Sequence, residues 1–198
     1  MKKETILPLY REKIKHYITF NEEEWNVFAE YLDLKKLNKN EYFVKTGDIC
    51  EELGFIFDGS VRYCNMVDGV EITGYFTFKN NFITALKSYL THEASLYDIV
   101  TLEDTTFVTI SKKNIQLLLS NPLMACKMER FGRLISEQYN ILFEDRIKSF
   151  VLQTPEERYI DLLKSGKEIV KNIPLQYIAQ FIGITPVSLS RIRKRIHQ

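Results

Sequence analysis

The chain has few of the residues that mark several large classes of protein. Its 198 residues include only three cysteines, eight glycines and five prolines. Cys50, Cys64 and Cys126 are too scattered for a disulfide framework, so we expect a reducing compartment, the cytoplasm. The basic amino terminus has no unbroken apolar core, so we expect no signal peptide there. The longest uncharged run, residues 172–190, contains several polar side chains, so we expect no membrane partner.

Histidine is also scarce, and this argues against an enzyme. A jelly-roll metalloenzyme needs a cluster of histidine ligands with a carboxylate, but His16, His92 and His197 lie far apart in the sequence. No glycine-rich phosphate loop and no nucleophile elbow is visible. We therefore expect no catalytic residues, no metal site and no cofactor.

The composition supports a folded core, because 45% of the residues are hydrophobic and 13% are aromatic. Residues 1–35 have helical patterns, with Asn21 and Glu24 at the spacing of a capping box. Residues 37–110 contain short runs of β-branched and aromatic residues, separated by turn signals such as Asp58-Gly59 and Asp68-Gly69. This pattern predicts an antiparallel β jelly roll or sandwich.

Helices are predicted again after Ile110. A short helix begins at Ser111, and a helix of about 28 residues, or about 40 Å, covers residues 123–150. Its apolar residues recur at steps of three and four: Met128, Phe131, Ile135, Tyr139 and Leu142. Such a face either covers the sandwich or pairs with a second copy, and we favour pairing in a homodimer. We place the domain boundary so that residues 1–149 form one domain and residues 150–198 the other.

The carboxy-terminal domain has the helix start and stop signals of a helix-turn-helix. Thr154-Pro155 begins a helix that Ser165-Gly166 is expected to end. Pro174 is expected at the first position of the next helix, whose apolar face comprises Leu175, Ile178, Ala179 and Ile182. Gly183 then ends that helix, and Thr185 caps a second one that begins at Pro186. Leu189, Ile192 and Ile196 form its buried face, with Ile184 and Leu189 as a hydrophobic staple.

The opposite face of the second helix is suited to DNA. Val187, Ser188 and Arg191 are candidates for base contacts in the major groove. Thr185, Lys194 and Arg195 are candidates for phosphate contacts, and Ser190 flanks the face that Val187, Arg191 and Lys194 form. A helix whose cations are merely solvated is the simpler alternative, but the preceding two-helix pattern favours DNA binding.

The chain resembles the Crp/Fnr family of bacterial transcription regulators. The matching segments are EERYIDLL at 156–163, IPLQYIAQFIGITPVSLSRIRK at 173–194, FIFDGSVRYC at 55–64, VEITGYFTF at 70–78 and LEDTTFVTI at 102–110. The resemblance implies an α+β protein with a jelly-roll sensor domain, a long dimerisation helix and a winged helix-turn-helix. It also implies a homodimer that binds palindromic double-stranded DNA. Residues 168–172 would have to supply a wing strand. RNA polymerase is a candidate further partner.

The sequence departs from the members of that family that bind cyclic AMP. Ala85 stands where they have the ribose-binding glutamate, and Ser95 stands near their phosphate-binding arginine. No arginine occurs between Arg62 and Arg130, so we expect no binding of cyclic AMP. Three cysteines, none within the first 49 residues, also exclude the family's iron–sulfur cluster.

A different small-molecule effector, or none, is left open. The candidate pocket residues are Phe82, Ala85, Leu86, Tyr89, Ser95 and Tyr97. Aromatic core packing is the favoured interpretation of the set Tyr75, Phe76, Phe78, Phe82, Tyr89 and Tyr97, and an apolar or aromatic ligand is the alternative.

The net charge of +1 is the sum of two regions of opposite charge. Residues 150–198 contain eight basic and four acidic residues, a net charge of +4. The other 149 residues contain 19 basic and 22 acidic residues, a net charge of −3. A basic reading head attached to a mildly acidic sensor fits a polyanionic partner. The alternative is a sensor or interaction protein whose helix-turn-helix has lost sequence-specific DNA binding.

Overall fold

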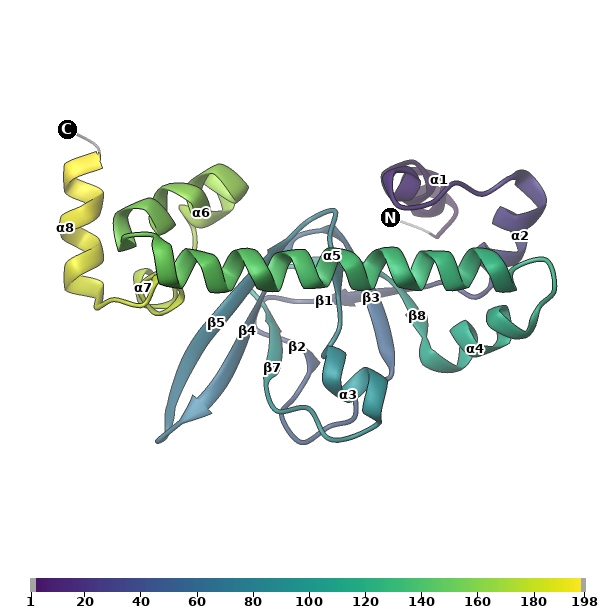
Figure 1. Ribbon diagram of the computed structural model, residues 1–198, viewed down its shortest axis with the longest axis horizontal. Coiled ribbons are helices and arrows are strands. Elements are labelled where there is room, and N and C mark those ends of the chain that lie inside the picture. The colour runs from purple at the N-terminus through teal and green to yellow at the C-terminus, as the bar shows by residue number, and fades with distance from the viewer. Residues whose placement is uncertain (1–2, 197–198) are drawn as a thin grey trace.

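The computed structural model describes residues 3–196, with the backbone alone for residues 165–169. Its helices are α1 (Lys3–Lys13), the 3-10 turn η1 (Ile14–His16), α2 (Glu22–Glu30), α3 (Leu86–Thr91), α4 (Lys112–Ser120), α5 (Ala125–Leu152), α6 (Pro155–Val170), α7 (Leu175–Ile182) and α8 (Pro186–Ile196). Its strands are β1 (Asp33–Leu37), β2 (Tyr42–Val44), β3 (Glu52–Asp58), β4 (Ser60–Val67), β5 (Val70–Phe78), β6 (Phe82–Ile83), β7 (Asp98–Thr101) and β8 (Thr105–Ser111). Figure 1 shows α5 running along the whole molecule, with α1, α2 and α4 at one end and α6–α8 at the other.

The strands form the predicted antiparallel sandwich. One sheet has the order β1-β8-β3-β6 and the other the order β2-β7-β4-β5, and all pairs are antiparallel. The predicted turn at Asp68-Gly69 joins β4 to β5, and both residues have positive φ (50° and 76°), as a two-residue hairpin requires. Buried residues from both sheets, among them Ile56, Val61 and Phe107, fill the space between the sheets.

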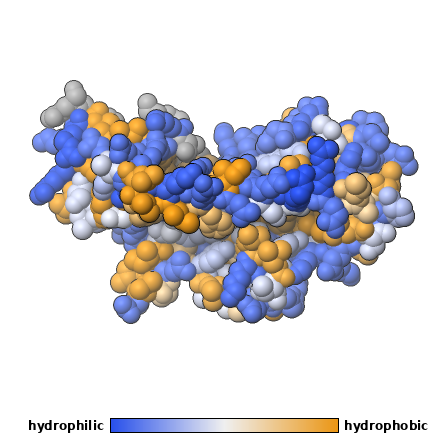
Figure 2. Space-filling model, in the orientation of Figure 1, coloured by the Kyte–Doolittle hydropathy of each residue, from blue (hydrophilic) through white to orange (hydrophobic). Residues whose placement is uncertain are grey.

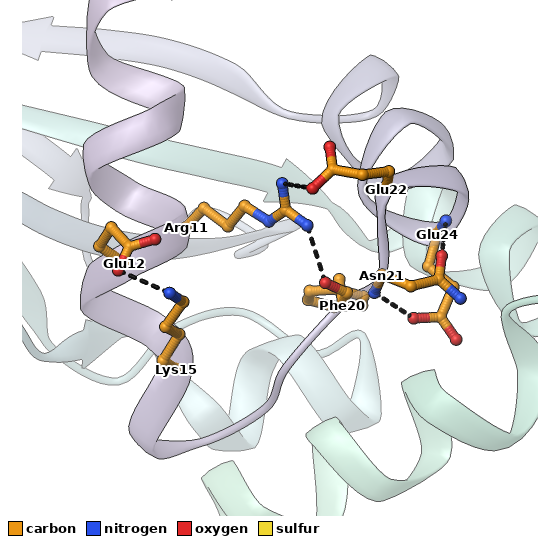
Figure 3. Close-up of polar contacts among 7 residues, drawn as sticks. All are labelled: Arg11, Glu12, Lys15, Phe20, Asn21, Glu22 and Glu24. Carbon is orange, nitrogen blue, oxygen red and sulfur yellow. Dashed lines mark hydrogen bonds and ion pairs between the residues drawn. The ribbon is translucent and has the colours of Figure 1, made fainter.

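One arginine holds the two amino-terminal helices together, and a capping box begins the second helix (Figure 3). Asn21 accepts the backbone N–H of Glu24, and the Glu24 carboxylate accepts the N–H of Asn21, so the predicted capping box is confirmed. The Arg11 guanidinium of α1 donates to the Glu22 carboxylate and to the Phe20 carbonyl, both at 2.8 Å. The two bonds of Arg11 fix α2 against α1 at the end of the sandwich where α5 begins.

The long helix is present, but part of its apolar face is already covered. α5 spans 28 residues, two positions later than predicted. Met128, Phe131 and Ile135 are buried in the chain's own core, where the Phe131 ring packs against those of Phe28 and Phe82. Of the two other residues assigned to the dimer seam, Tyr139 is half-buried against this core, and its hydroxyl donates to the Phe82 carbonyl at 3.3 Å; Leu142 is also half-buried. In this structure the first three side chains are not free to meet a second copy, which corrects that residue assignment.

The boundaries of the carboxy-terminal helices differ from the prediction in three places. α6 does not end at Ser165-Gly166 but continues to Val170, whose side chain is buried against α7 and α8. That burial outweighs the cost of about 0.5–1 kcal/mol for a glycine inside a helix. Residues 168–172 therefore complete α6 and a turn rather than a wing strand, and no strand follows Ser111 in the part of the chain that the structure describes. Pro174 caps α7 instead of occupying its first position.

Among the described residues, no helix is both long and apolar enough to cross a membrane.

Candidate functional site

The turn between α7 and α8 is built as the sequence predicted. Gly183 has φ of 76° and donates its N–H to Gln180, while Ile184 donates to the Ala179 carbonyl at 2.9 Å. These two bonds form a Schellman motif, which satisfies the carbonyls at the end of α7. Thr185 then accepts the backbone N–H of Ser188 at 3.2 Å and so caps α8. The geometry fixes a sharp turn between two short helices.

The two helices pack through a shared apolar core. Ile178, Ala179 and Ile182 of α7 are fully buried, and Leu189 and Ile192 of α8 lie against them. Ala179 has only a methyl group, which permits the close crossing. One face of α8 is thereby committed to packing, and the other face is left to solvent.

The exposed face of α8 holds three of the seven predicted DNA contacts. Val187, Arg191 and Lys194 are exposed and lie at positions i, i+4 and i+7, hence on one side of the helix. Neither Arg191 nor Lys194 forms an ion pair with any described side chain. Two free cations and one exposed methyl-bearing side chain therefore project together.

The four other predicted contacts, Thr185, Ser188, Ser190 and Arg195, already have partners within the chain. Ser188 is half-buried and shares its hydroxyl with that of Thr185 at 3.0 Å. Ser190 donates its hydroxyl to the Pro186 carbonyl at 3.0 Å. Arg195 forms an ion pair with Glu156 of α6 at 2.6 Å. Because this pair is solvent-exposed, it is worth little and a phosphate could replace the carboxylate.

The carboxy-terminal helices also dock on the sandwich, which the sequence did not indicate. The Gln180 side chain accepts the N–H of Thr73 at 3.0 Å and donates to the carbonyl of Glu71 at 2.9 Å, both in β5. Phe76 of β5 is buried in the core of α6–α8 rather than inside the sandwich. The Arg62 guanidinium, paired with Glu71, lies 4.0 Å above the ring of Tyr177. β5 and α7 thus form a direct junction.

Arg146 of α5 reinforces this junction. Its guanidinium lies 3.7 Å from the ring centroid of Phe181 and 4.3 Å from that of Phe150. Its Nη2 donates to the carbonyls of Gly74 at 3.0 Å and Phe181 at 2.6 Å. One side chain therefore links α5, β5 and α7.

A cavity of about 1240 Å³ lies between the sandwich, α5 and the carboxy-terminal helices. Three of the six predicted pocket residues, Phe82, Leu86 and Tyr97, line it. Ala85 and Ser95 do not: both are buried, Ala85 in the core between the sheets and Ser95 with its hydroxyl donating to the carbonyl of Tyr97 at 2.7 Å. Tyr89 also lies outside the cavity lining. These three assignments are corrected: Ala85 and Ser95 have short side chains that are buried in the interior, and the half-buried ring of Tyr89 lies 5.4 Å from the Lys112 ammonium.

The described residues bring together one group of metal-ligand atoms. The thiol of Cys64 and the carboxylates of Glu71 and Asp98 lie within 4.8 Å of one another. The Arg62 guanidinium already pairs with Glu71. Burial raises the pKa of the Cys64 thiol to about 12, so the thiol is protonated at neutral pH. An ion would have to displace both the arginine and the thiol proton, and we assign no metal role to this group.

Comparisons with known proteins agree with this architecture. Residues 34–121 match the family described as cyclic nucleotide-binding domain. No curated protein matches the chain. The chain is similar in structure to the c-di-GMP responsive global regulator CLP of Xanthomonas campestris, with 14% identity and a TM-score of 0.67 over 87% of this chain and 89% of that one.

Two further solved structures have the same arrangement. FixK2 of Bradyrhizobium japonicum is 16% identical, with a TM-score of 0.63 over 84% of both chains. A protein of Eubacterium rectale, described as a transcriptional regulator of the crp/fnr family, is 16% identical, with a TM-score of 0.64 over 96% of this chain and 86% of that one. At these identities the likeness establishes the fold, an antiparallel sandwich followed by a long helix and a helical carboxy-terminal part.

Proposed function

We propose that this chain, which has the fold of the Crp/Fnr-type regulators, is a DNA-binding transcription regulator. The observation that carries the proposal is the outer face of α8, where Val187, Arg191 and Lys194 project together behind a fully capped turn. A recognition helix reads base edges with its first turns and holds phosphates with its later cations. We assign Val187 and Arg191 to base contact, and Lys194 to phosphate contact.

The chain acts as a homodimer on a palindromic operator in this proposal. Support comes from the second half of α5, where Phe143, Ile147 and Val151 are 56%, 65% and 75% exposed at i, i+4 and i+8. Figure 2 shows hydrophobic side chains gathered over this part of α5. An unpaired apolar stripe on a long helix is suited to an isologous contact with the same stripe of a second copy. This stripe replaces the seam of Met128, Phe131 and Ile135.

The effector is not cyclic AMP. No arginine belongs to β6, α3 or β7, the segment in which cyclic nucleotide binders hold the phosphate. Ser95, near the expected arginine position, has its backbone N–H and hydroxyl bonded within the chain. We further propose that residues 1–149 sense a signal, that residues 150–198 read DNA, and that both work in the cytoplasm.

In vitro selection of DNA sequences by the purified full-length protein tests the proposal. We expect enrichment of an inverted repeat that wild type binds and that Arg191→Ala binds more weakly. If selection enriches no sequence, or if both proteins bind the selected DNA equally, α8 is not a reading head. The chain would then be a sensor whose helix-turn-helix makes no sequence-specific contact with DNA, the second candidate function. The ion pair of Arg195 with Glu156 favours that candidate, because it occupies a predicted DNA contact.

A further inference from the structure

Arg146 is a partly buried cation without a counter-charge in the described part of the chain. It forms no ion pair there, and its only hydrogen bonds are those of Nη2 to two backbone carbonyls. Its Nε and Nη1 donors have no hydrogen-bond partner among the residues that the structure describes. Burial lowers the pKa of Arg146 to about 10, as expected for a cation that is poorly compensated.

A second guanidinium adds to the positive charge at this end of the cavity. Arg158 of α6 is 9% exposed, and within the described part of the chain it donates to the carbonyls of Ser149, Gln153 and Ile182 alone. Its positive charge further lowers the pKa of Arg146. The carboxylates of Asp145 and Asp161 also line the cavity, but neither is paired with Arg146 or Arg158. Both cations also lie over the ring of Phe150, but their hydrogen bonds go to carbonyls and no described carboxylate is paired with them, which favours an anion.

The other end of the same cavity is aromatic. Tyr63, Tyr97 and Tyr139 line it beside Phe82 and Leu86. The hydroxyl of Tyr139 donates to the Phe82 carbonyl at 3.3 Å. Burial raises the pKa of the Tyr63 and Tyr139 hydroxyls, so both are neutral at physiological pH. This end can take an apolar or aromatic body but offers no charge to a cyclic phosphate.

We propose that the cavity binds an organic monoanion with an aromatic or aliphatic body, whose acid group sits on Arg146. The body lies among Tyr63, Tyr97 and Tyr139, and the acid group accepts a charge-assisted hydrogen bond from Nη1 of Arg146, because Nη2 already donates to the two carbonyls. A guanidinium donates such a bond to a carboxylate, a sulfonate or a phosphate. The ligand class follows from the cavity alone.

The regulatory consequence rests on the proposed function. Arg146 also holds the carbonyl of Phe181 in α7, the first helix of the helix-turn-helix. An acid group bound to Arg146 therefore alters the contact between Arg146 and Phe181, which orients α7 and α8 relative to the sandwich. We expect such a ligand to change the affinity for the operator, because binding to one orientation in preference to another shifts their populations.

Fluorescence titration with two probes tests the site. Anilinonaphthalene sulfonate has an aromatic body and an acid group, and N-phenylnaphthylamine is the same body without the acid. We expect the full-length protein to bind one sulfonate probe per chain, and Arg146→Gln to weaken it by about tenfold or more, the loss typical of a charged hydrogen bond. The neutral probe should change by less than about twofold, because it makes no charged bond.

Two further variants keep the outcome interpretable. Arg133→Gln removes an exposed arginine of the same helix that lies outside the cavity and should alter neither probe. Leu86→Trp fills the aromatic end without touching Arg146 and should weaken both probes. Circular dichroism establishes that each variant is folded.

Three results would overturn the site: equal binding of the sulfonate probe by wild type and Arg146→Gln, no loss in Leu86→Trp, or binding confined to a monomeric fraction. The last result would mean that a second copy's helix fills the cavity. DNA selection is a separate measurement. An operator without probe binding refutes the ligand site alone, and probe binding without an operator refutes the regulator alone.

Discussion

Gln180 of α7 pairs with the backbone of β5 as a neighbouring strand would. Its side-chain amide accepts the N–H of Thr73 at 3.0 Å and donates to the carbonyl of Glu71 at 2.9 Å. β5 is the edge strand of its sheet. One glutamine side chain thus satisfies two edge groups and fastens the carboxy-terminal helices to the sandwich.

Replacing Gln180 should loosen this junction. Gln180→Leu leaves the Thr73 N–H and the Glu71 carbonyl without their protein partners, at a cost of about 1–3 kcal/mol if water does not replace them. We expect faster hydrogen exchange at Thr73 and in α7, measured by mass spectrometry. Gln176→Leu is the matched control, because Gln176 is exposed on the same helix. Unchanged exchange in Gln180→Leu would mean that the contact does not hold the two parts together.

Local signals in the sequence were sufficient for the elements and for the turn of the candidate site. Asn21 and Thr185 accept the backbone N–H of the residue three positions on, and Gly183 takes the left-handed conformation. Each of these features depends on neighbouring residues alone, so a pattern of a few positions predicts it. The same holds for the outer face of α8.

The features that depend on tertiary packing could not be predicted in this way. Phe131 and Ile147 both follow the helical repeat of α5, but only the fold decides that Phe131 packs against α2 while Ile147 is exposed. The sequence pattern at Gly166 predicted a helix end, but the burial of Val170 outweighs the free-energy cost of a glycine inside the helix. The contact of Gln180 with Thr73 joins residues 107 positions apart and leaves no local signal.

Arg191 should determine sequence preference. Arg191→Ala is expected to cost about 1–3 kcal/mol on the selected operator and to relax the preference at one base pair, because a bidentate contact to guanine is lost. Fluorescence anisotropy with single-base variants of the operator measures both effects. Lys113→Ala removes an exposed cation of α4, far from α8, and should leave binding unchanged. A uniform loss across all sequences would place Arg191 on phosphate instead.

Lys194 should contribute affinity without preference. Lys194→Ala is expected to weaken binding to all sequences alike and to reduce the slope of log affinity against log salt by about 1, because one phosphate contact is lost. Titrations at several salt concentrations measure the slope. A change in base preference, or an unchanged slope, would contradict this role.

The stability of the amino-terminal end should fall in acid through Glu24. Its carboxylate accepts from Lys127 and from the N–H of Asn21, which lowers the pKa of Glu24. A lowered pKa means that this stabilisation is present above the unfolded value of about 4.3 and is lost as pH falls through the folded value. Glu24→Gln should therefore flatten the dependence of Tm on pH below about pH 5. Glu23→Gln, an exposed neighbour, should leave the curve as in wild type.

Two apolar side chains of α5 should separate folding from dimerisation. Ile147 is 65% exposed, and Ile147→Glu places a charge in the proposed seam, so we expect a folded monomer in analytical ultracentrifugation. Phe131 is 2% exposed, and Phe131→Ala should lower the free energy of unfolding by about 3–5 kcal/mol through the cavity it leaves. Ser136→Glu, at an exposed position of the same helix, is the control for added charge. If Ile147→Glu still forms dimers, the second half of α5 is not the dimer interface. If Phe131→Ala loses dimers at unchanged stability, the interface lies in the first half of α5 instead.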